Sequence, residues 1–107
     1  DPVCRMIYDG IVAVRKHIGN TPELEKAMKA VTSAYVSDSR WPPLPTSPGR
    51  FNVRETLDDL YLANRMLEEA MAKGGIAEKR AIYSAPLMLT QIRLIEQILM
   101  EQKYFGE

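Results

Sequence analysis

Apolar residues recur at alternating intervals of three and four in four separate stretches of this sequence, and this spacing is the strongest constraint on its fold. Side chains at that spacing return to one face of an α-helix, so each stripe marks a helix that faces a core. We find neither an internal repeat nor an alternation long enough for a β-strand. The sequence therefore predicts an all-α protein, a four-helix bundle formed by a single domain over residues 1–107.

The stripes place the helices at about residues 3–18, 22–37, 53–73 and 77–104, and the last is expected to be the longest. Gly19-Asn20 and Thr21-Pro22 supply C-cap and N-cap chemistry between the first two helices, which we expect to form a helical hairpin. Asn52 and Glu55 have the spacing of a capping box at the start of the third helix.

A proline-rich crossover is predicted over residues 38–51, because four prolines lie within it and exclude a helix. Trp41 is expected to anchor this segment on the bundle or to act as an exposed hot spot for a protein partner. The same prolines match short motifs that aromatic grooves recognise, but such matches arise by chance in any proline-dense loop.

Pro86 falls inside the last predicted helix, where it removes a backbone hydrogen bond. Two structures are compatible with this position. Either the helix continues with a kink, which we favour, or Ser84 caps a new helix with Pro86 in its first turn, and residues 76–83 form a separate short helix.

The last helix also has more apolar residues than one core-facing stripe needs. The surplus residues taken as candidates for partner binding are Leu87, Leu94, Ile98 and Met100. Such a helix is either central in the bundle or covers a partner.

Asn64 interrupts the apolar stripe of the third helix, and we expect it at the edge of that stripe, with Ala63 taking the core position. In an alternative interpretation the protein binds a small ligand or associates with an enzyme. Its pocket would then lie near the Pro86 kink, lined by Met88, Asn64 and either Tyr61 or Tyr83.

Composition excludes several function classes. The 14 basic and 14 acidic residues give a formal net charge of zero, so the long-range attraction behind general nucleic-acid binding is missing. One Cys and one His do not suffice for the usual zinc site.

Polar residues and Pro86 interrupt the longest apolar stretch, so no membrane span is expected. Because the sequence begins at Asp1, we expect a processed form or a fragment, and the cellular compartment stays open.

Catalytic residues are not evident, so we predict that the protein is not an enzyme and needs no cofactor or metal. Cys4 and His17 are 13 residues apart, about 20 Å along one continuous helix, and cannot form a nucleophile pair within it. Most carboxylates fall off the apolar stripes and are typical of a solvated face. No glycine-rich phosphate loop is present in the sequence.

These observations favour a non-enzymatic protein–protein interaction module. We expect a small accessory, adaptor or assembly protein that docks on a protein partner, or on a second copy of itself, through the apolar face of its last helix.

Overall fold

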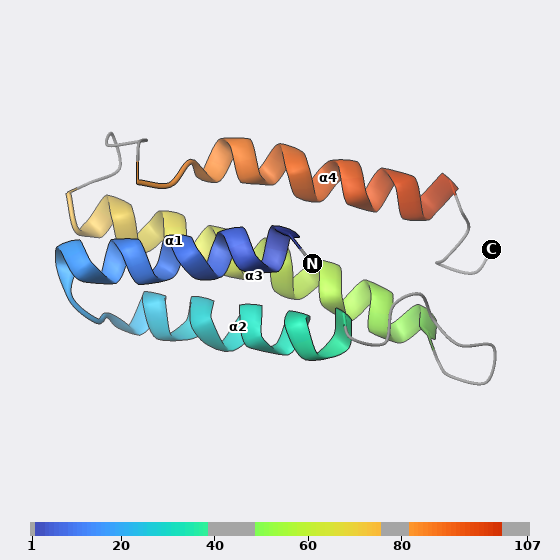
Figure 1. Cartoon of the computed structure of the whole chain (residues 1–107), viewed down its shortest axis with the longest axis horizontal. Helices are drawn as coiled ribbons and strands as arrows, with labels where there is room; N and C mark the ends of the chain where they lie inside the picture. The colour runs from blue at the N-terminus through green and yellow to red at the C-terminus, as the bar shows by residue number, and fades with distance from the viewer. Residues whose placement is uncertain (1, 39–48, 76–81, 102–107) are drawn as a thin grey trace.

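The computed structural model describes residues 2–38, 49–75 and 82–101, which form four helices and no strand. The helices are α1 (Pro2–Ile18), α2 (Pro22–Asp38), α3 (Gly49–Lys73) and α4 (Ala85–Glu101). Consecutive helices run in opposite directions along the long axis of the molecule (Figure 1). The predicted all-α four-helix bundle is confirmed.

The central helix of the bundle is α3. It contacts all three other helices, and its most extensive contact is with α2. Within the described part of the chain, α4 contacts α3 and α1 but not α2, so it lies at one edge of the bundle. A central position for the last helix, one of the two explanations of its surplus apolar residues, is therefore wrong.

Local capping fixes the hairpin between α1 and α2 as the sequence predicts. Gly19 follows the last residue of α1 with a φ of 78°, the left-handed conformation that glycine adopts without strain. The hydroxyl of Thr21 accepts a hydrogen bond from the Leu24 amide at 3.1 Å, and Pro22 takes the first helical position.

The third helix begins earlier than predicted, at Gly49 rather than Val53, so the Asn52–Glu55 capping box does not mark its start. No proline follows Pro48 before the apolar stripe, and nothing in the sequence prevents the helix from extending back to that point. With 25 residues α3 is the longest of the four helices, against 17 in α4. The expectation that the last helix is the longest is wrong.

The last helix does not pass through Pro86 with a kink. Ile82, Tyr83 and Ser84 are not helical, and α4 starts at Ala85 with Pro86 in its first turn. The Ser84 hydroxyl accepts a hydrogen bond from the Leu87 amide at 3.3 Å, so Ser84 caps the helix. The favoured kink is wrong and the alternative start is correct, because a proline in the first turn removes no helical hydrogen bond. Residues 77–81 and 102–104 of the predicted helix lie outside the described residues. Of the separate short helix that the alternative predicts over residues 76–83, residues 82 and 83 are not helical and the others lie outside the described residues.

Where the predicted stripes fall on residues whose burial is described, their side chains are buried or half-buried, with one exception. The largest fully buried aliphatic side chains come from all four helices and are Ile7, Ile11, Val14, Leu24, Leu57, Leu60, Leu67 and Ile92. The spacing of four, three and four residues from Leu24 through Met28 and Val31 predicts that Tyr35 also faces the core, but Tyr35 is 62% exposed. It lies near the end of α2 and borders a groove between α2 and α1.

A glycine inside α1 allows a close approach between distant parts of the chain. Gly10 is buried, and the aromatic ring of Tyr83 lies directly against its backbone. A Cβ atom built on Gly10 would be 2.4 Å from Cδ1 of Tyr83, far inside contact distance. Glycine normally weakens a helix interior, but here it provides the space that the Tyr83 ring fills.

We predict that Gly10→Ala destabilises the protein although alanine is the better helix former. The added methyl group must displace the Tyr83 ring, and overpacking of this kind costs about 1–3 kcal/mol. The free energy of unfolding from chemical denaturation measures this cost. In a Tyr83→Ala background the clash is absent, and Gly10→Ala should instead stabilise by about 1 kcal/mol. If Gly10→Ala changes the free energy of unfolding in the same direction in both backgrounds, the contact between Gly10 and the Tyr83 ring is contradicted.

Candidate functional site

Two buried hydrogen bonds hold the start of α4 in place. Tyr83 donates its hydroxyl proton to Oδ1 of Asn64 at 2.7 Å, and Nδ2 of Asn64 donates to the backbone oxygen of Ala85 at 3.1 Å. Asn64 lies in the middle of α3 and is only 5% exposed. The prediction that it lies at the edge of its stripe is wrong: both Ala63 and Asn64 are buried. Both the oxygen and the nitrogen of the Asn64 side-chain amide are hydrogen-bonded, which offsets the cost of removing it from water.

Tyr83 is held as a neutral phenol. Burial raises its pKa well above the ordinary value, and the charge of Glu68 raises it further. Its hydroxyl is already bound to Asn64. Tyr83 therefore supports the local structure and is not a free acid or base.

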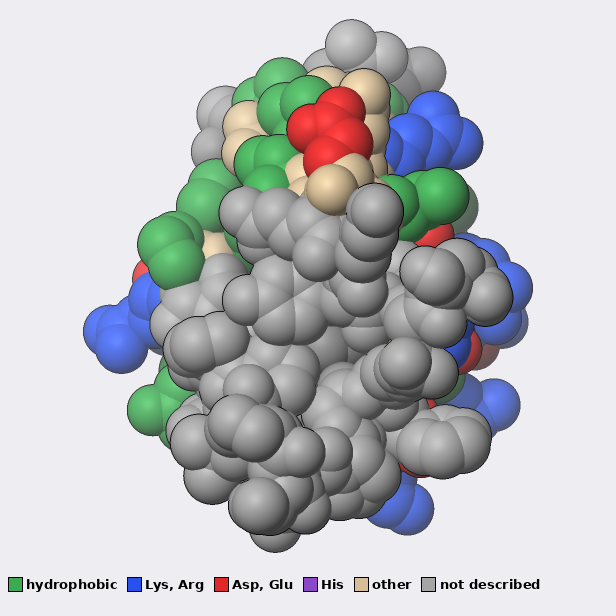
Figure 2. All heavy atoms as spheres, turned by 90° about the vertical axis from the view of Figure 1, so that its right-hand side faces the viewer, with side chains coloured by type: hydrophobic (Ala, Val, Ile, Leu, Met, Phe, Trp, Pro, Cys, Tyr) green, Lys and Arg blue, Asp and Glu red, His purple; other side chains and the backbone are tan. Residues whose placement is uncertain are grey.

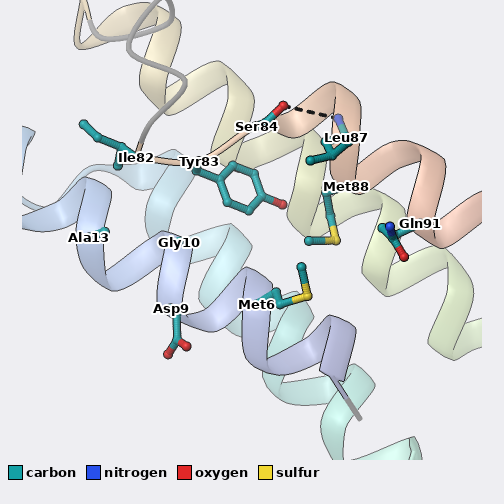
Figure 3. A pocket seen from close by; sticks show the side chains of 10 residues that line it. All are labelled: Met6, Asp9, Gly10, Ala13, Ile82, Tyr83, Ser84, Leu87, Met88 and Gln91. Carbon is teal, nitrogen blue, oxygen red and sulfur yellow. Dashed lines mark hydrogen bonds between the residues drawn. The ribbon is translucent and has the colours of Figure 1, made fainter.

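A pocket of about 420 Å³ lies between α1, the residues that precede α4 and the first turns of α4. Figure 3 shows Met6 and Met88 pointing toward each other across it, with the Tyr83 ring beside Gly10. Asp9 points away from the pocket and forms an ion pair with Arg5 at 3.3 Å. Met88 and Tyr83 line the pocket as the ligand-binding alternative predicts, but Asn64 and Tyr61 do not.

Three of the four surplus residues of α4 form one exposed stripe. Leu87, Leu94 and Ile98 are 64%, 50% and 51% exposed. Their spacing places them within about 40° of one another around the helix axis, with Gln91 on the same line. We call Leu87, Gln91, Leu94 and Ile98 the outer stripe of α4.

Met100 does not belong to the outer stripe. It is also exposed, but it follows Ile98 by two residues and therefore lies about 200° away around the helix. A count of surplus apolar residues groups all four, because it does not assign each residue to a side of the helix. Met100 is corrected to the opposite flank.

The outer stripe begins at the pocket, since Leu87 and Gln91 are also pocket residues. Farther along, the second half of α4 extends past the N-terminal end of α1 (Figure 1). The described part of α1 therefore lies beside the first half of α4 and does not reach the end of that helix. Viewed from the end of the molecule where α4 terminates, hydrophobic side chains reach the surface around a carboxylate group (Figure 2).

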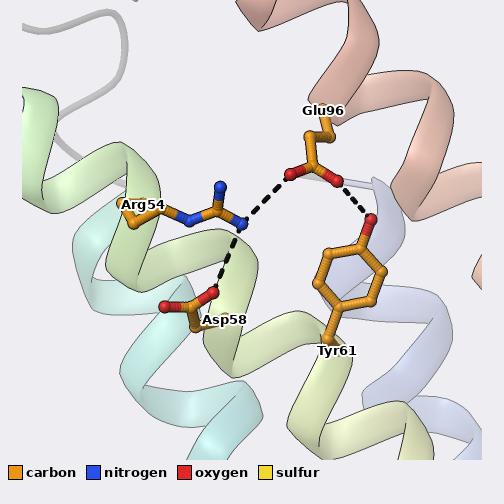
Figure 4. A network of polar contacts seen from close by, with 4 residues as sticks. All are labelled: Arg54, Asp58, Tyr61 and Glu96. Carbon is orange, nitrogen blue, oxygen red and sulfur yellow. Dashed lines mark hydrogen bonds and ion pairs between the residues drawn. The ribbon is translucent and has the colours of Figure 1, made fainter. Parts of the chain in front are cut away.

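The other flank of α4 is joined to α3 by polar contacts. Glu96 accepts a hydrogen bond from Tyr61 at 2.5 Å and one from Arg54 at 3.1 Å, and Arg54 also pairs with Asp58 (Figure 4). Partial burial and the neighbouring Glu96 carboxylate raise the pKa of Tyr61 to about 12. These contacts direct Glu96 toward α3, so the outer stripe faces away from it.

One predicted partner-binding residue, Trp41, remains, together with the Cys4–His17 pair and the metal site that the sequence argues against. Trp41, a candidate partner contact, lies outside the described residues. His17 is exposed at the end of α1, with Nδ1 3.0 Å from the backbone oxygen of Ala13, while Cys4 is buried. Both lie on the uninterrupted helix α1. Among residues 2–38, 49–75 and 82–101, no group of three or more His, Cys, Asp or Glu side chains could hold a metal ion.

Sequence reasoning missed two features. One is the contact of Gly10 with Tyr83, for which a glycine in the middle of a strong helical stripe was the available signal. The other is a groove of about 630 Å³ between α1 and α2, lined by residues that include Cys4, Tyr8 and Tyr35. The failure of Tyr35 to join the core becomes visible only once α1 and α2 are placed together.

Comparisons with protein-family models, with curated proteins and with solved structures give no match to this chain. None of the helices in the described ranges is both long and apolar enough to cross a membrane. A function can therefore be inferred only from the geometry of α4 and of the pocket beside it.

We predict that Asn64→Ala destabilises the protein by about 2–3 kcal/mol, because it leaves the Tyr83 hydroxyl and the Ala85 carbonyl without their partner. Tyr83→Phe removes only one of the two hydrogen bonds and should cost about 1 kcal/mol. Equilibrium urea unfolding of both variants and of the double variant measures these values. If the two single effects simply add, the two residues are not coupled as the structure indicates.

Proposed function

We propose that this chain is a non-enzymatic protein–protein interaction module, a small helical accessory, adaptor or assembly protein that docks through the outer stripe of α4. The observation that carries the proposal is the exposure of Leu87, Leu94 and Ile98 on one line of an edge helix. Burial of each such side chain is favourable by about 1–2 kcal/mol, and together they supply the apolar centre of a small interface.

The pocket beside Leu87 supports a protein partner, because its walls present methionine and tyrosine carbon atoms. The Tyr83 hydroxyl is bound to Asn64, and the Asp9 carboxylate points away. An aliphatic side chain from a partner fits such a hollow well, as in the insertion of an amphipathic helix into an apolar groove. The balanced charge of the chain also favours a protein over a nucleic acid as partner.

We predict that Leu94→Asp weakens association at least about tenfold, since a buried, unpaired carboxylate opposes binding by more than 1.4 kcal/mol. Recovery of partners on immobilised chain and the molar mass from light scattering are the two readouts. Helicity by circular dichroism should stay near the wild-type value, because Leu94 is half exposed in the free chain.

Met100→Asp is the matched control. Met100 is an exposed apolar residue of the same helix but lies off the outer stripe, so association should change less than about twofold. Equal losses in the two variants would argue against docking through the stripe. Unchanged association in Leu94→Asp would remove the proposal altogether.

Small-ligand binding is the second candidate function, and the pocket of about 420 Å³ lined by Met88 and Tyr83 is the observation that favours it. A ligand that binds only the folded chain raises the melting temperature as its concentration rises above Kd. A thermal-shift screen with small apolar compounds tests this, with Ala13→Phe as the variant that fills the pocket. A shift in wild type that disappears in the filled variant would support this function.

A further inference from the structure

We propose that the outer stripe of α4 pairs with the same stripe of a second copy of this chain, with the two α4 helices antiparallel and Ile98 of each copy inserted beside Leu87 of the other. This inference rests on the proposed function, since it names the partner for the same surface.

The spacing of the stripe is that of a helix–helix seam. Leu87, Gln91, Leu94 and Ile98 follow one another at intervals of four, three and four residues, which is the repeat of the contact positions in a coiled coil. The core-facing residues Met88, Ile92 and Leu99 are buried within the copy's own bundle. Helix α4 therefore has two apolar sides, one used within the chain and one available for a second helix.

The two ends of the stripe are complementary in shape. Leu87 borders the pocket between α1 and α4, whereas Ile98 lies in the second half of α4, which extends past the described part of α1. A twofold rotation about the middle of the stripe brings Ile98 of one copy to the pocket of the other, and the reverse contact forms at the same time. In a parallel pair, each pocket would face the other and neither would receive a side chain.

Charge does not oppose self-association along the stripe. Arg93 and Glu96 are the charged residues between Leu87 and Ile98. Glu96 is directed toward Arg54 and Tyr61 of α3. Arg93 precedes Leu94 by one residue and so lies about 100° from it around the helix. The stripe therefore meets its own copy without placing two like charges opposite each other.

The short reach of α1 leaves space for this arrangement. Since the described part of α1 lies beside only the first half of α4, it does not block the approach of the partner's second half to the pocket (Figure 1). The same twofold rotation places the second half of each copy's α4 beside the first half of the other copy's α4. The exposed side chain of Met6, which also lines the pocket, adds to the apolar contact.

Size-exclusion chromatography with light scattering over a hundredfold range of concentration is the first test. The wild-type mass should rise from that of one chain toward that of two as concentration increases. Ile98→Asp should remain at the mass of one chain throughout, and Met100→Asp should behave like wild type. Circular dichroism checks that each variant keeps its helical content, because Ile98 is half exposed in the single chain.

Cysteine cross-linking tests the direction of pairing and does not depend on a destabilising variant. A mixture of Leu87→Cys and Ile98→Cys chains, oxidised with glutathione disulfide, should form a cross-linked species of two chains. Either variant alone should not. Residues 87 and 98 of one chain are about 16 Å apart along the helix, too far for a disulfide within a copy. The native Cys4 is buried, and a mixture of Leu87→Cys with Met100→Cys serves as the control.

Each outcome decides between the two proposals. A mass of one chain at every concentration would overturn pairing with a second copy, and cross-linking of Leu87→Cys alone would overturn the antiparallel direction. If the chain stays single but recovers another protein through contacts that Leu94→Asp abolishes, the interaction module survives and its partner is a different molecule. If the chain neither pairs nor binds through the stripe, both proposals fail.

Discussion

The contact of Tyr83 with Gly10 and Asn64 is the interaction on which the position of α4 depends. One aromatic side chain packs against the backbone of α1 and donates a hydrogen bond to the centre of α3. The same asparagine binds the first residue of α4. Three helices are thus joined through a single buried group of atoms. An edge helix with few neighbours needs such an attachment, because its buried apolar area alone does not determine where it begins.

The contact of Tyr83 with Gly10 and Asn64 also accounts for the pocket between α1 and α4 and for the exposure of the outer stripe. With Tyr83 in place, the first turn of α4 stands away from Gly10 and Ala13, which leaves the pocket between α1 and α4. Glu96 then binds Arg54 and Tyr61 and fixes the rotation of α4 about its own axis. This rotation buries Met88, Ile92 and Leu99 and leaves the outer stripe exposed. In the folded chain, the hydrogen bonds of Asn64 to Ala85 and of Glu96 to Arg54 and Tyr61 therefore set the position of the candidate interface.

Most features that depend on neighbouring residues could be predicted from the sequence, although the capping box of Asn52 and Glu55 does not mark the start of α3. The helical stripes, the Thr21 cap and the left-handed Gly19 are local and were predicted. Pro86 is compatible with two local structures; the Ser84 cap is local, but the contacts of Tyr83 and Asn64 that hold the start at Ala85 are with distant residues. Tyr35 and Met100 were misplaced for the same reason. Apolar character and spacing say which residues share a side of a helix, but the position of the neighbouring helices decides which side is buried.

The edge position of α4 has a consequence for the order in which the molecule comes apart. Helices α1, α2 and α3 contact one another without α4, whereas α4 rests on α3 and α1 alone. Regions with fewer buried contacts open at a lower free energy than the core of a protein. The helix that carries the docking surface is therefore the one expected to detach first. A partner that covers the outer stripe would protect the weakest part of the chain, so binding and local folding would be thermodynamically linked.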